Sequence, residues 1–198
     1  MESIWINDTW ASAEYQEEKK KNFEVVTRYL KSPPTKLLDI GCGLAWESRM
    51  FGNQFNTELW LVDGDAENNK DKDSNSKETK WHASTNSFLF YHTIDLLDTE
   101  LKKLNTPNYH LIDCNVLNIP DNIKFDIVTS WLSCGFHYPV STYRELILKH
   151  SHKDTRVIVD LRTQGKGQDP ILENGVEIVS ILKKYRKHVT AEVQFCKL

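Results

Sequence analysis

A glycine-containing turn directly after a buried apolar run is the feature that most constrains this fold. Lys36 to Ile40 has the composition of a short buried strand, and Gly41-Cys42-Gly43 follows it at once. Residues 44–54 are then predicted to form a helix, and residues 59–63 a second apolar strand. A strand, a glycine turn, a helix and a strand make a βαβ unit, and a parallel sheet is the natural setting of such a unit.

The rest of the chain adds elements of the same two kinds. Helices are predicted over residues 8–31, 87–104 and 140–150, and buried strands over residues 109–113, 125–130 and 156–161. Polar and apolar residues alternate over 176–181 and 189–195, which favours a terminal antiparallel hairpin over a competing helix across 178–185. We therefore predict an α/β fold with a doubly wound, mostly parallel sheet.

Length and composition indicate one domain. The chain has 198 residues, a net charge of −3 and 39% hydrophobic residues, which suits a single globular unit. Residues 1–34 are predicted to be a helical extension of it, and residues 67–86 a polar surface insertion. No apolar run approaches the roughly 18–20 residues that cross a bilayer, and the first residues lack the pattern of a signal peptide. We therefore expect a cytoplasmic protein without membrane contact.

The cysteines do not indicate a metal site or a disulfide framework. They stand at positions 42, 114, 134 and 196 without a CxxC pair, so free thiols are expected. Cys134 and His137 have the spacing of two metal ligands, but no second pair completes a tetrahedral site. We expect no metal.

The glycine turn and the acidic end of the next strand together indicate a nucleoside-binding site. Gly41 and Gly43 allow a tight turn and leave no Cβ in the way of a ligand. Asp63 follows Gly43 by about 20 residues, a spacing at which a carboxylate accepts hydrogen bonds from ribose hydroxyls.

The residues around the turn distinguish between cofactors. A dinucleotide site needs a third glycine and an open helix N-terminus for the pyrophosphate, whereas this turn continues into the crowded and acidic Leu44-Ala45-Trp46-Glu47. Asp39, just before the turn, suits a cationic group such as the ammonium of an amino acid. S-adenosylmethionine carries an ammonium, a ribose and a sulfonium but no phosphate, so these residues favour it over NAD.

Four segments of the chain resemble the class I S-adenosylmethionine-dependent methyltransferase superfamily. They are DIGCGLA at 39–45, LVDGD at 61–65, LIDCNVLNIP at 111–120 and FDIVTSWLSCGFHYP at 125–139, within a resemblance that covers residues 35–198. The first segment has Ala45 where the family often has a third glycine. The resemblance implies a seven-stranded Rossmann-like sheet closed by the antiparallel hairpin, and a methyltransferase activity.

The resemblance also implies which residues contact the cofactor. They stand at the ends of four predicted strands: Asp39, Gly41, Cys42, Gly43, Asp63, Gly64, Asp113, Cys114, Ser130 and Trp131. The glycines would pass under the cofactor, and Asp63 would hold its ribose. The Cys114 backbone N–H would read the adenine edge together with Asp113, and Ser130 and Trp131 would lie beside the methionine part.

Each carboxylate also has a simpler interpretation. Asp39 is able to cap the helix that follows the turn. Asp63 and Asp113 are able to serve as ordinary turn carboxylates after their strands. Both interpretations stay open at this point.

The segment 130–139 is the expected acceptor side of the site. It follows a strand of the parallel sheet and so lies at the carboxyl edge, where ligands bind in such folds. His137 is the candidate general base, because an unperturbed pKa of about 6.5 suits proton removal from a hydroxyl at neutral pH. Tyr138 is the second catalytic candidate, as a group that orients a hydroxyl. The alternatives are a packed histidine and a space-filling tyrosine.

Three hypotheses about function follow. The first is O-methylation of a small-molecule hydroxyl, such as that of a sugar, because segment 130–139 resembles the loop of some O-methyltransferases and lacks nucleic-acid base N-methyltransferase motifs. The second is a nucleic-acid or nucleotide methyltransferase, with the basic residues 183–188 as its phosphate contact. The third is a non-catalytic subunit that binds the cofactor. The low net charge favours the first, and the oligomeric state stays open.

Overall fold

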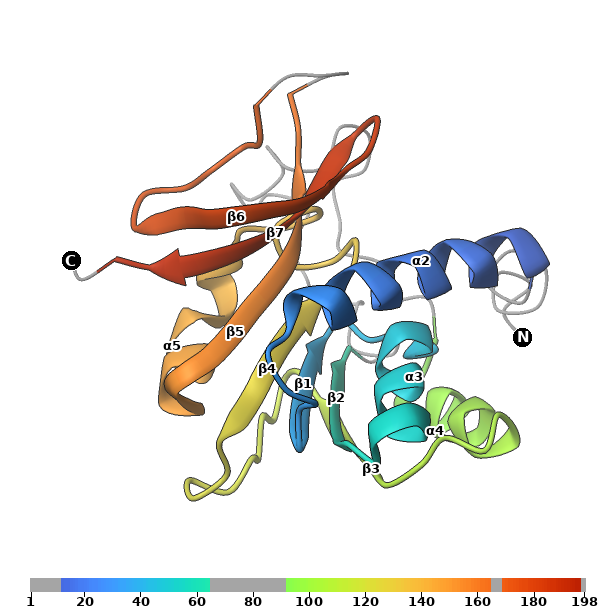
Figure 1. Ribbon diagram of the computed structural model, residues 1–198. Helices are drawn as coiled ribbons and strands as arrows, with labels where there is room; N and C mark the ends of the chain where they lie inside the picture. Colours follow the sequence, from blue (N-terminus) through green and yellow to red (C-terminus); the bar gives the residue numbers. More distant parts are fainter. Residues whose placement is uncertain (1–11, 65–91, 165–168, 197–198) are drawn as a thin grey trace.

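A seven-stranded sheet forms the centre of the computed structural model, which describes residues 12–64, 92–164 and 169–196 (Figure 1). Its strands are β1 (Lys36–Ile40), β2 (Glu58–Asp63), β3 (Tyr109–Asp113), β4 (Phe125–Ser130), β5 (Ser151–Arg162), β6 (Val176–Lys184) and β7 (His188–Phe195). Their order across the sheet is β3-β2-β1-β4-β5-β7-β6. β1 to β5 run parallel, and β7 is antiparallel to both β5 and β6. The predicted α/β fold with a closing hairpin is thereby confirmed.

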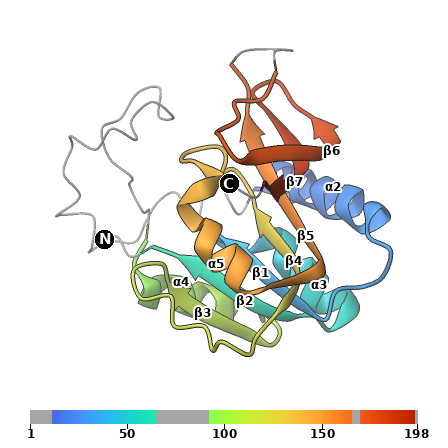
Figure 2. The same ribbon diagram turned by 90° about the vertical axis from the view of Figure 1, so that its left-hand side faces the viewer.

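Helices cover both faces of this sheet. They are α2 (Ala13–Tyr29), α3 (Trp46–Phe55), α4 (Ile94–Lys103), the short 3-10 helix η3 (Val140–Tyr143) and α5 (Arg144–Lys149). α2, α3 and α4 share one core and lie on one face, whereas α5 packs in the core of the other face. Figure 2 shows α5 in front of the strands, with α2 and α3 behind them.

The strands feed two cores because neighbouring side chains of a strand point to opposite faces. Leu37 of β1 packs with Phe51 in the core beneath α2, α3 and α4. Leu38 packs with Ile147 in the core beneath α5. Asp39 shares the face of Leu37, so this alternation places a buried carboxylate beneath the helices that flank the glycine turn.

Predicted and observed elements agree in kind and differ at some ends. β5 begins at Ser151, five residues before the predicted start at 156. The competing helix across 178–185 is wrong, because β6 forms an antiparallel ladder with β7 over this range. The predicted polar insertion 67–86 and residues 8–11 of the first predicted helix lie outside the described residues.

Local chemistry explains two helix starts. α4 begins at Ile94, because the Thr93 hydroxyl accepts a hydrogen bond from the Leu96 N–H at 3.2 Å and caps the helix there. The helix predicted over 140–150 begins instead as the 3-10 turn η3. Val140 and Thr142 are β-branched, which lowers helix propensity in that turn.

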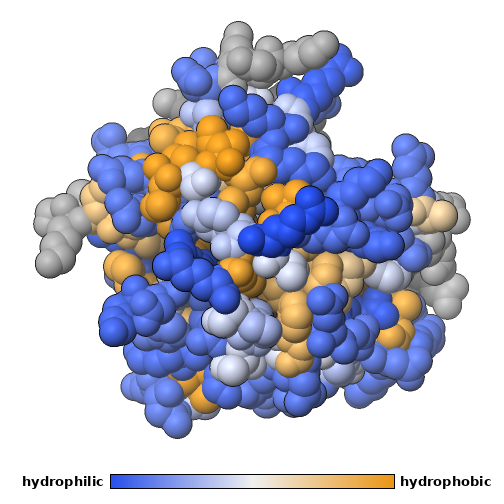
Figure 3. All heavy atoms as spheres, viewed as in Figure 1, coloured by the Kyte–Doolittle hydropathy of each residue, from blue (hydrophilic) through white to orange (hydrophobic). Residues whose placement is uncertain are grey.

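β6 is an edge strand with exposed apolar side chains. Val179 and Ile181 are 48% and 40% exposed, and Figure 3 shows a hydrophobic patch over this hairpin. Two shifts of register interrupt the β6–β7 ladder, and such irregular edges resist pairing with a further strand. None of the helices in the described ranges is long and apolar enough to cross a membrane.

Removal of the Phe51 ring tests the core beneath α2 and α3. Phe51 is fully buried, and its ring meets the Phe23 ring edge-on with 4.8 Å between centroids. We expect Phe51→Ala to lower the free energy of unfolding by about 3–5 kcal/mol, because the variant loses buried area and leaves a cavity. Urea unfolding followed by circular dichroism measures the change. Leu148→Ala, at an exposed position of α5, is the control, and an equal effect of both variants would contradict this core.

Candidate functional site

The glycine turn lies at the carboxyl edge of the sheet and is held against β2. Gly41 and Gly43 have φ values of +72° and +49°, a region that glycine enters without strain. The N–H groups of Gly41 and Cys42 both donate to the Val62 carbonyl, at 2.8 and 3.1 Å. Ala45 also has a positive φ of +49°, a region that residues other than glycine seldom enter.

Asp63, at the end of β2, holds the turn through both carboxylate oxygens. Oδ2 accepts from the Gly43 N–H and Oδ1 from the Gly64 N–H, each at 2.7 Å. Buried His92, which the sequence analysis missed, places its Nε2 3.6 Å from Oδ1. A carboxylate has about four acceptor positions, so its bonds to the turn leave capacity for a ribose. Asp63 is therefore a turn carboxylate and a candidate ligand group at once.

Asp39 is fully buried beneath the turn. Its Oδ2 accepts from the Ser48 hydroxyl at 2.6 Å, and its Oδ1 has no hydrogen-bond partner among the described residues. Burial raises the pKa of Asp39 to about 7, although the Ser48 hydrogen bond acts to lower it. The capping interpretation does not apply, because α3 is capped at Ala45 without a side-chain hydrogen bond. What Asp39 offers is a buried oxygen that lacks a partner.

The loop after β4 covers the turn more closely than the sequence indicated. A Cβ on Gly41 would lie 1.9 Å from Ser133 Oγ and 3.5 Å from Tyr138 Oη, and these hydroxyls are 2.7 Å apart. The close approach of this loop thus requires glycine at position 41, a reason different from the predicted passage under a cofactor. Burial raises the pKa of Tyr138 well above its ordinary value, so its hydroxyl is protonated at neutral pH.

Backbone hydrogen bonds change the prediction for the end of β3. The Cys114 N–H donates to the Asp63 carbonyl at 2.8 Å as part of the β2–β3 pairing, so it is not available to read an adenine. Asp113 Oδ1 accepts from the backbone N–H and the side-chain amide of Asn115, both at 2.8 Å. This is the turn interpretation of Asp113. Its other carboxylate oxygen takes no part in that turn.

Ser130 and Trp131 have different roles in the loop. The Ser130 hydroxyl donates to the Ile40 carbonyl at 2.7 Å and accepts from the Cys134 N–H at 2.8 Å, so it fixes the loop to β1. This use of the hydroxyl differs from the predicted contact with a methionine. Trp131 is buried, and its indole N–H has no hydrogen-bond partner in the described part of the chain. An unpaired buried donor costs about 1–3 kcal/mol, so Trp131 stays a candidate for ligand contact.

His137 is half-buried in the same loop. Its backbone N–H donates to the Ser133 carbonyl at 2.7 Å. Its ring meets the Phe136 ring edge-on, with 4.9 Å between the ring centroids. Phe136 in turn lies 5.0 Å from the Arg162 guanidinium and 5.7 Å from the His188 ring. The acceptor loop therefore contacts the end of β5 and the start of β7. A role of His137 as proton acceptor stays a prediction.

A buried ion pair links α2 to the start of α3. Lys19 Nζ lies 3.0 Å from Glu47 Oε1, with side-chain exposures of 5% and 4%, and Asn22 donates to the same oxygen at 3.1 Å. Desolvation lowers the pKa of Lys19, but the attractions of Glu47, Tyr15 and Asp160 together outweigh it and the pKa is raised. Lys19 stands in the charged run Glu17 to Lys21, a composition that indicates a solvent-exposed helix face, and for Lys19 this expectation is wrong.

The start of α3 is a poor site for a phosphate. Buried Glu47 stands in its first turn, and buried Asp39 and Asp63 lie beside the glycine turn. Burial also raises the pKa of nearby Asp160 to about 6, against the lowering effects of its hydrogen bond with Thr190 and the charge of Lys19. An anion at this helix N-terminus would meet these carboxylates, so the surroundings fit a cationic ligand without phosphate.

The basic residues 183–188 form the tip of the β6–β7 hairpin at the same edge. Arg162, the last residue of β5, pairs with His188, the first of β7, which places the tip at the carboxyl edge (Figure 1). The exposed cations of the tip are Lys184, Arg186 and Lys187. Burial lowers the pKa of His188 to about 4, so this residue is neutral at pH 7 and does not belong to the basic surface.

Comparison with known proteins finds similarity in structure alone. No protein-family model matches the chain, and no curated protein matches its sequence. A mutant of MtNAS in complex with S-adenosylmethionine aligns with 100% of this chain and 68% of its own, at 13% identity and a TM-score of 0.58. The ribosomal protein L11 methylase of Lactobacillus delbrueckii subsp. bulgaricus aligns over 91% and 80%, at 10% identity and 0.56.

A third structure, the plantazolicin methyltransferase BpumL in complex with S-adenosylhomocysteine, aligns over 80% of this chain and 56% of its own, at 18% identity and a TM-score of 0.52. These alignments and the strand order agree. The chain has the class I methyltransferase fold. In this fold the glycine turn, Asp63 and the loop after β4 share the edge at which ligands bind.

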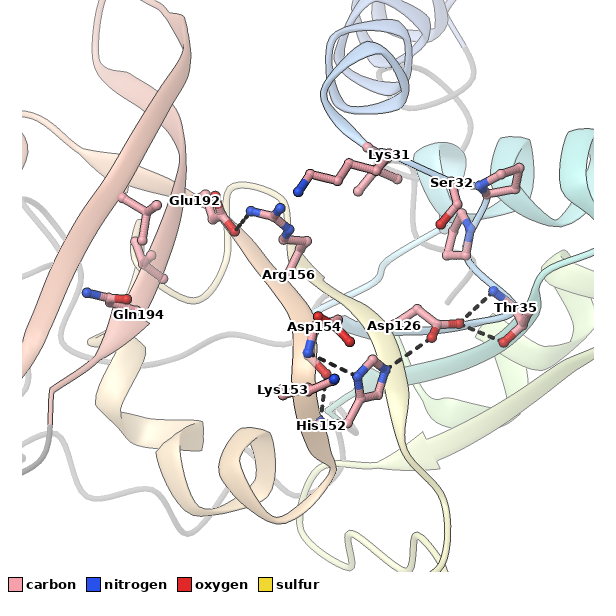
Figure 4. A pocket seen from close by; sticks show the side chains of 16 residues that line it. Lys31, Ser32, Thr35, Asp126, His152, Lys153, Asp154, Arg156, Glu192 and Gln194 are labelled. Atoms are coloured by element: carbon pink, nitrogen blue, oxygen red, sulfur yellow. Dashed lines mark hydrogen bonds and ion pairs between the residues drawn. The ribbon is translucent and has the colours of Figure 1, made fainter.

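A hollow lies at the edge of the sheet opposite to the glycine turn. A cavity of about 730 Å³ is lined by the link between α2 and β1 and by the amino ends of β4 and β5 (Figure 4). Four of its charged or titratable groups form two pairs. Asp126 accepts from the Thr35 N–H at 2.7 Å and lies 3.1 Å from His152, and Arg156 lies 2.8 Å from Glu192. None of the predicted site residues lines it, so the carboxyl edge is the candidate site.

The raised pKa of Asp39 predicts how stability changes with pH. The unfolded chain ionises this carboxyl near its ordinary pKa of 3.8, whereas the folded protein keeps it protonated until about pH 7. The folded state therefore binds the extra proton between these values, and stability falls as pH rises through this window, by up to roughly 4 kcal/mol. Urea unfolding between pH 4 and pH 8 measures the slope.

Asp39→Asn is expected to flatten that slope, because an amide does not titrate and still bonds Ser48. Asp154→Asn, at an exposed position, serves as the control and should keep the wild-type slope. A wild-type slope in Asp39→Asn would show that Asp39 is ionised in the folded protein at pH 4 and would contradict this account.

Proposed function

We propose that the protein transfers the methyl group of S-adenosylmethionine to an acceptor bound beside the loop 131–139. The observation that supports this most directly is Asp39 Oδ1, a fully buried carboxylate oxygen without a partner among the described residues, beneath the glycine turn of a class I fold. A ligand ammonium would donate a hydrogen bond to this oxygen and favour the ionised form of Asp39. The cofactor was predicted from the sequence, and it fits the residues that the structure brings together.

The proposed cofactor contacts are fewer than the sequence predicted. Asp63 holds the ribose with the acceptor capacity that its bonds to Gly43 and Gly64 leave free. Asp39 faces the ammonium, and the second oxygen of Asp113 accepts from the adenine amino group. The Cys114 N–H is left out because the sheet uses it.

The chain itself has to align the acceptor and receive its proton. Bound S-adenosylmethionine supplies a methyl group on a cationic sulfur, and alignment in a fixed geometry does much of the work in such a displacement. We assign proton removal from an acceptor hydroxyl to His137. Tyr138 stays protonated and so orients the acceptor as a hydrogen-bond donor, while buried Trp131 excludes water.

The similar structures leave the acceptor open, since one is a methylase of a ribosomal protein and another a methyltransferase of plantazolicin. The small-molecule hydroxyl predicted from the sequence is one candidate acceptor of the methyl group. A nucleic acid is the other. The two differ in charge, and the charge at the site edge distinguishes them.

Calorimetry with S-adenosylmethionine tests the cofactor assignment. We expect binding to the wild-type protein and a loss of affinity of about ten- to a hundredfold in Asp63→Asn, because hydrogen bonds to a charged group contribute about 1.5–3 kcal/mol. Asp154→Asn should bind as the wild type does. Thermal unfolding of both variants shows whether the fold is kept. Absence of binding to the wild-type protein would overturn the proposed function.

Product analysis separates methyl transfer from the alternatives. Transfer of the methyl group leaves S-adenosylhomocysteine, whereas transfer of the aminocarboxypropyl group leaves methylthioadenosine, a compound found with MtNAS in another of the similar structures. We expect S-adenosylhomocysteine when the protein is incubated with labelled cofactor and a mixture of RNA, DNA, nucleotides, sugars and small metabolites. Cofactor binding without either product would favour the non-catalytic subunit.

Substitution of His137 tests the proton acceptor. We expect His137→Gln to lower kcat by about 10²–10⁴-fold, with unchanged affinity for S-adenosylmethionine and with loss of the acidic limb of the pH–rate profile. His152→Gln, at the opposite edge of the sheet, is the matched control. A full rate of His137→Gln across the pH range would remove His137 from the reaction.

A further inference from the structure

The tip of the β6–β7 hairpin concentrates positive charge beside the candidate site. Residues 183–187 contain four cations. Because the whole chain has a net charge of −3, the remaining residues carry a net charge of −7. Lys184, Arg186 and Lys187 are exposed, and Figure 3 shows this tip as hydrophilic at the top of the view. The near-neutral total therefore hides a strongly basic tip on an otherwise acidic protein. Such a separation of charge orients a polyanion towards one edge of the molecule.

The tip is held in place by the network that supports the glycine turn. The Lys183 ammonium donates to Asn22 Oδ1 at 3.2 Å, and the Tyr185 hydroxyl donates to the same oxygen. Asn22 in turn donates to Glu47, at the start of α3. A basic tip that merely solubilised the protein would need no such connection. The connection fixes the exposed cations relative to the candidate cofactor site.

The shape of the tip indicates a polyanion rather than a small anion. A small anion is bound by donors that converge in a pocket, whereas Lys184, Arg186 and Lys187 project from a tight turn between two strands. The Tyr185 ring is stacked on His188 at 4.2 Å and covered by the Lys183 ammonium at 4.3 Å, so it is not free to stack on a base. The tip therefore offers charge without base recognition.

Charges on α2 modify this surface without cancelling it. Glu18 attracts the Lys183 ammonium more strongly than Lys21 repels it, and buried Asp160 and Glu47 also attract it. Arg162 lies at the end of β5 beside Phe136 of the acceptor loop. A phosphate chain that passes the tip thus has one further cation, Arg162, on the side of the loop that carries His137.

We propose that the hairpin tip binds the phosphate backbone of a nucleic-acid acceptor and presents one of its nucleotides to the loop 131–139. This proposal rests on the proposed function for the nature of the reaction, but the contact itself does not depend on it. The contact is electrostatic and independent of base sequence. It should therefore weaken steeply with salt.

Salt-dependent binding of labelled single-stranded RNA and DNA of equal length and sequence tests the contact. In Arg186→Gln/Lys187→Gln we expect the slope of log affinity against log salt to become shallower by about 1.4, because each lost phosphate contact contributes about 0.7 on single strands. Lys31→Gln/Lys153→Gln removes two exposed cations at the opposite edge and should keep the wild-type slope. Binding of RNA alone, of DNA alone or of both identifies the acceptor class.

Two results would overturn the proposal. One is absence of binding of either nucleic acid by the wild-type protein at low salt, which would return the small-molecule hydroxyl to first place. The other is an equal change of slope in both double variants, which would assign the binding to the overall field. Calorimetry with S-adenosylmethionine on the tip variant should give the wild-type affinity. A wild-type protein that binds RNA through the tip but not the cofactor refutes the proposed function and leaves the contact standing.

Discussion

The buried ion pair between Lys19 and Glu47 is the interaction on which the candidate site depends. It joins α2 to the first turn of α3, directly after the glycine turn, and Asn22 extends it to the hairpin. Breaking a buried pair by removing one partner leaves an uncompensated charge and costs about 3–5 kcal/mol. The ion pair and the hydrogen bonds of Asn22 therefore join three segments that are far apart in the sequence. These contacts fix the position of the basic tip relative to the glycine turn.

The parts of the fold that could be predicted are those that depend on the pattern of neighbouring residues in the sequence. Residues 36–40 and 59–63 are apolar runs of strand length on either side of a glycine turn, and the alternation over 189–195 indicates the closing hairpin. These patterns depend on neighbours along the chain. They correctly gave the class I sheet, although the helix predicted at 140–150 starts as a 3-10 turn that its β-branched residues favour.

The parts of the site that could not be predicted depend on contacts across the chain. Lys19 stands in a run of charged residues, a composition that indicates solvent exposure, and nothing local shows that Glu47 will meet it. Ser133 gains its place through the loop that folds onto Gly41. The Cys114 N–H illustrates a further limit, since a motif identifies a residue but not whether the sheet already uses its hydrogen bond. Accounting for every backbone donor required the structure.

The net charge of the chain likewise does not show where its charged side chains lie. A net charge of −3 describes no surface of this molecule, because buried carboxylates surround the glycine turn while exposed cations occupy the hairpin tip. At physiological ionic strength exposed charges more than about 8 Å apart are largely screened from one another, whereas buried charges are screened less. The acidic turn and the basic tip can therefore act on different parts of a complex. A cation suits the first and a polyanion the second, and Lys19 neutralises the charge of Glu47 at the start of α3.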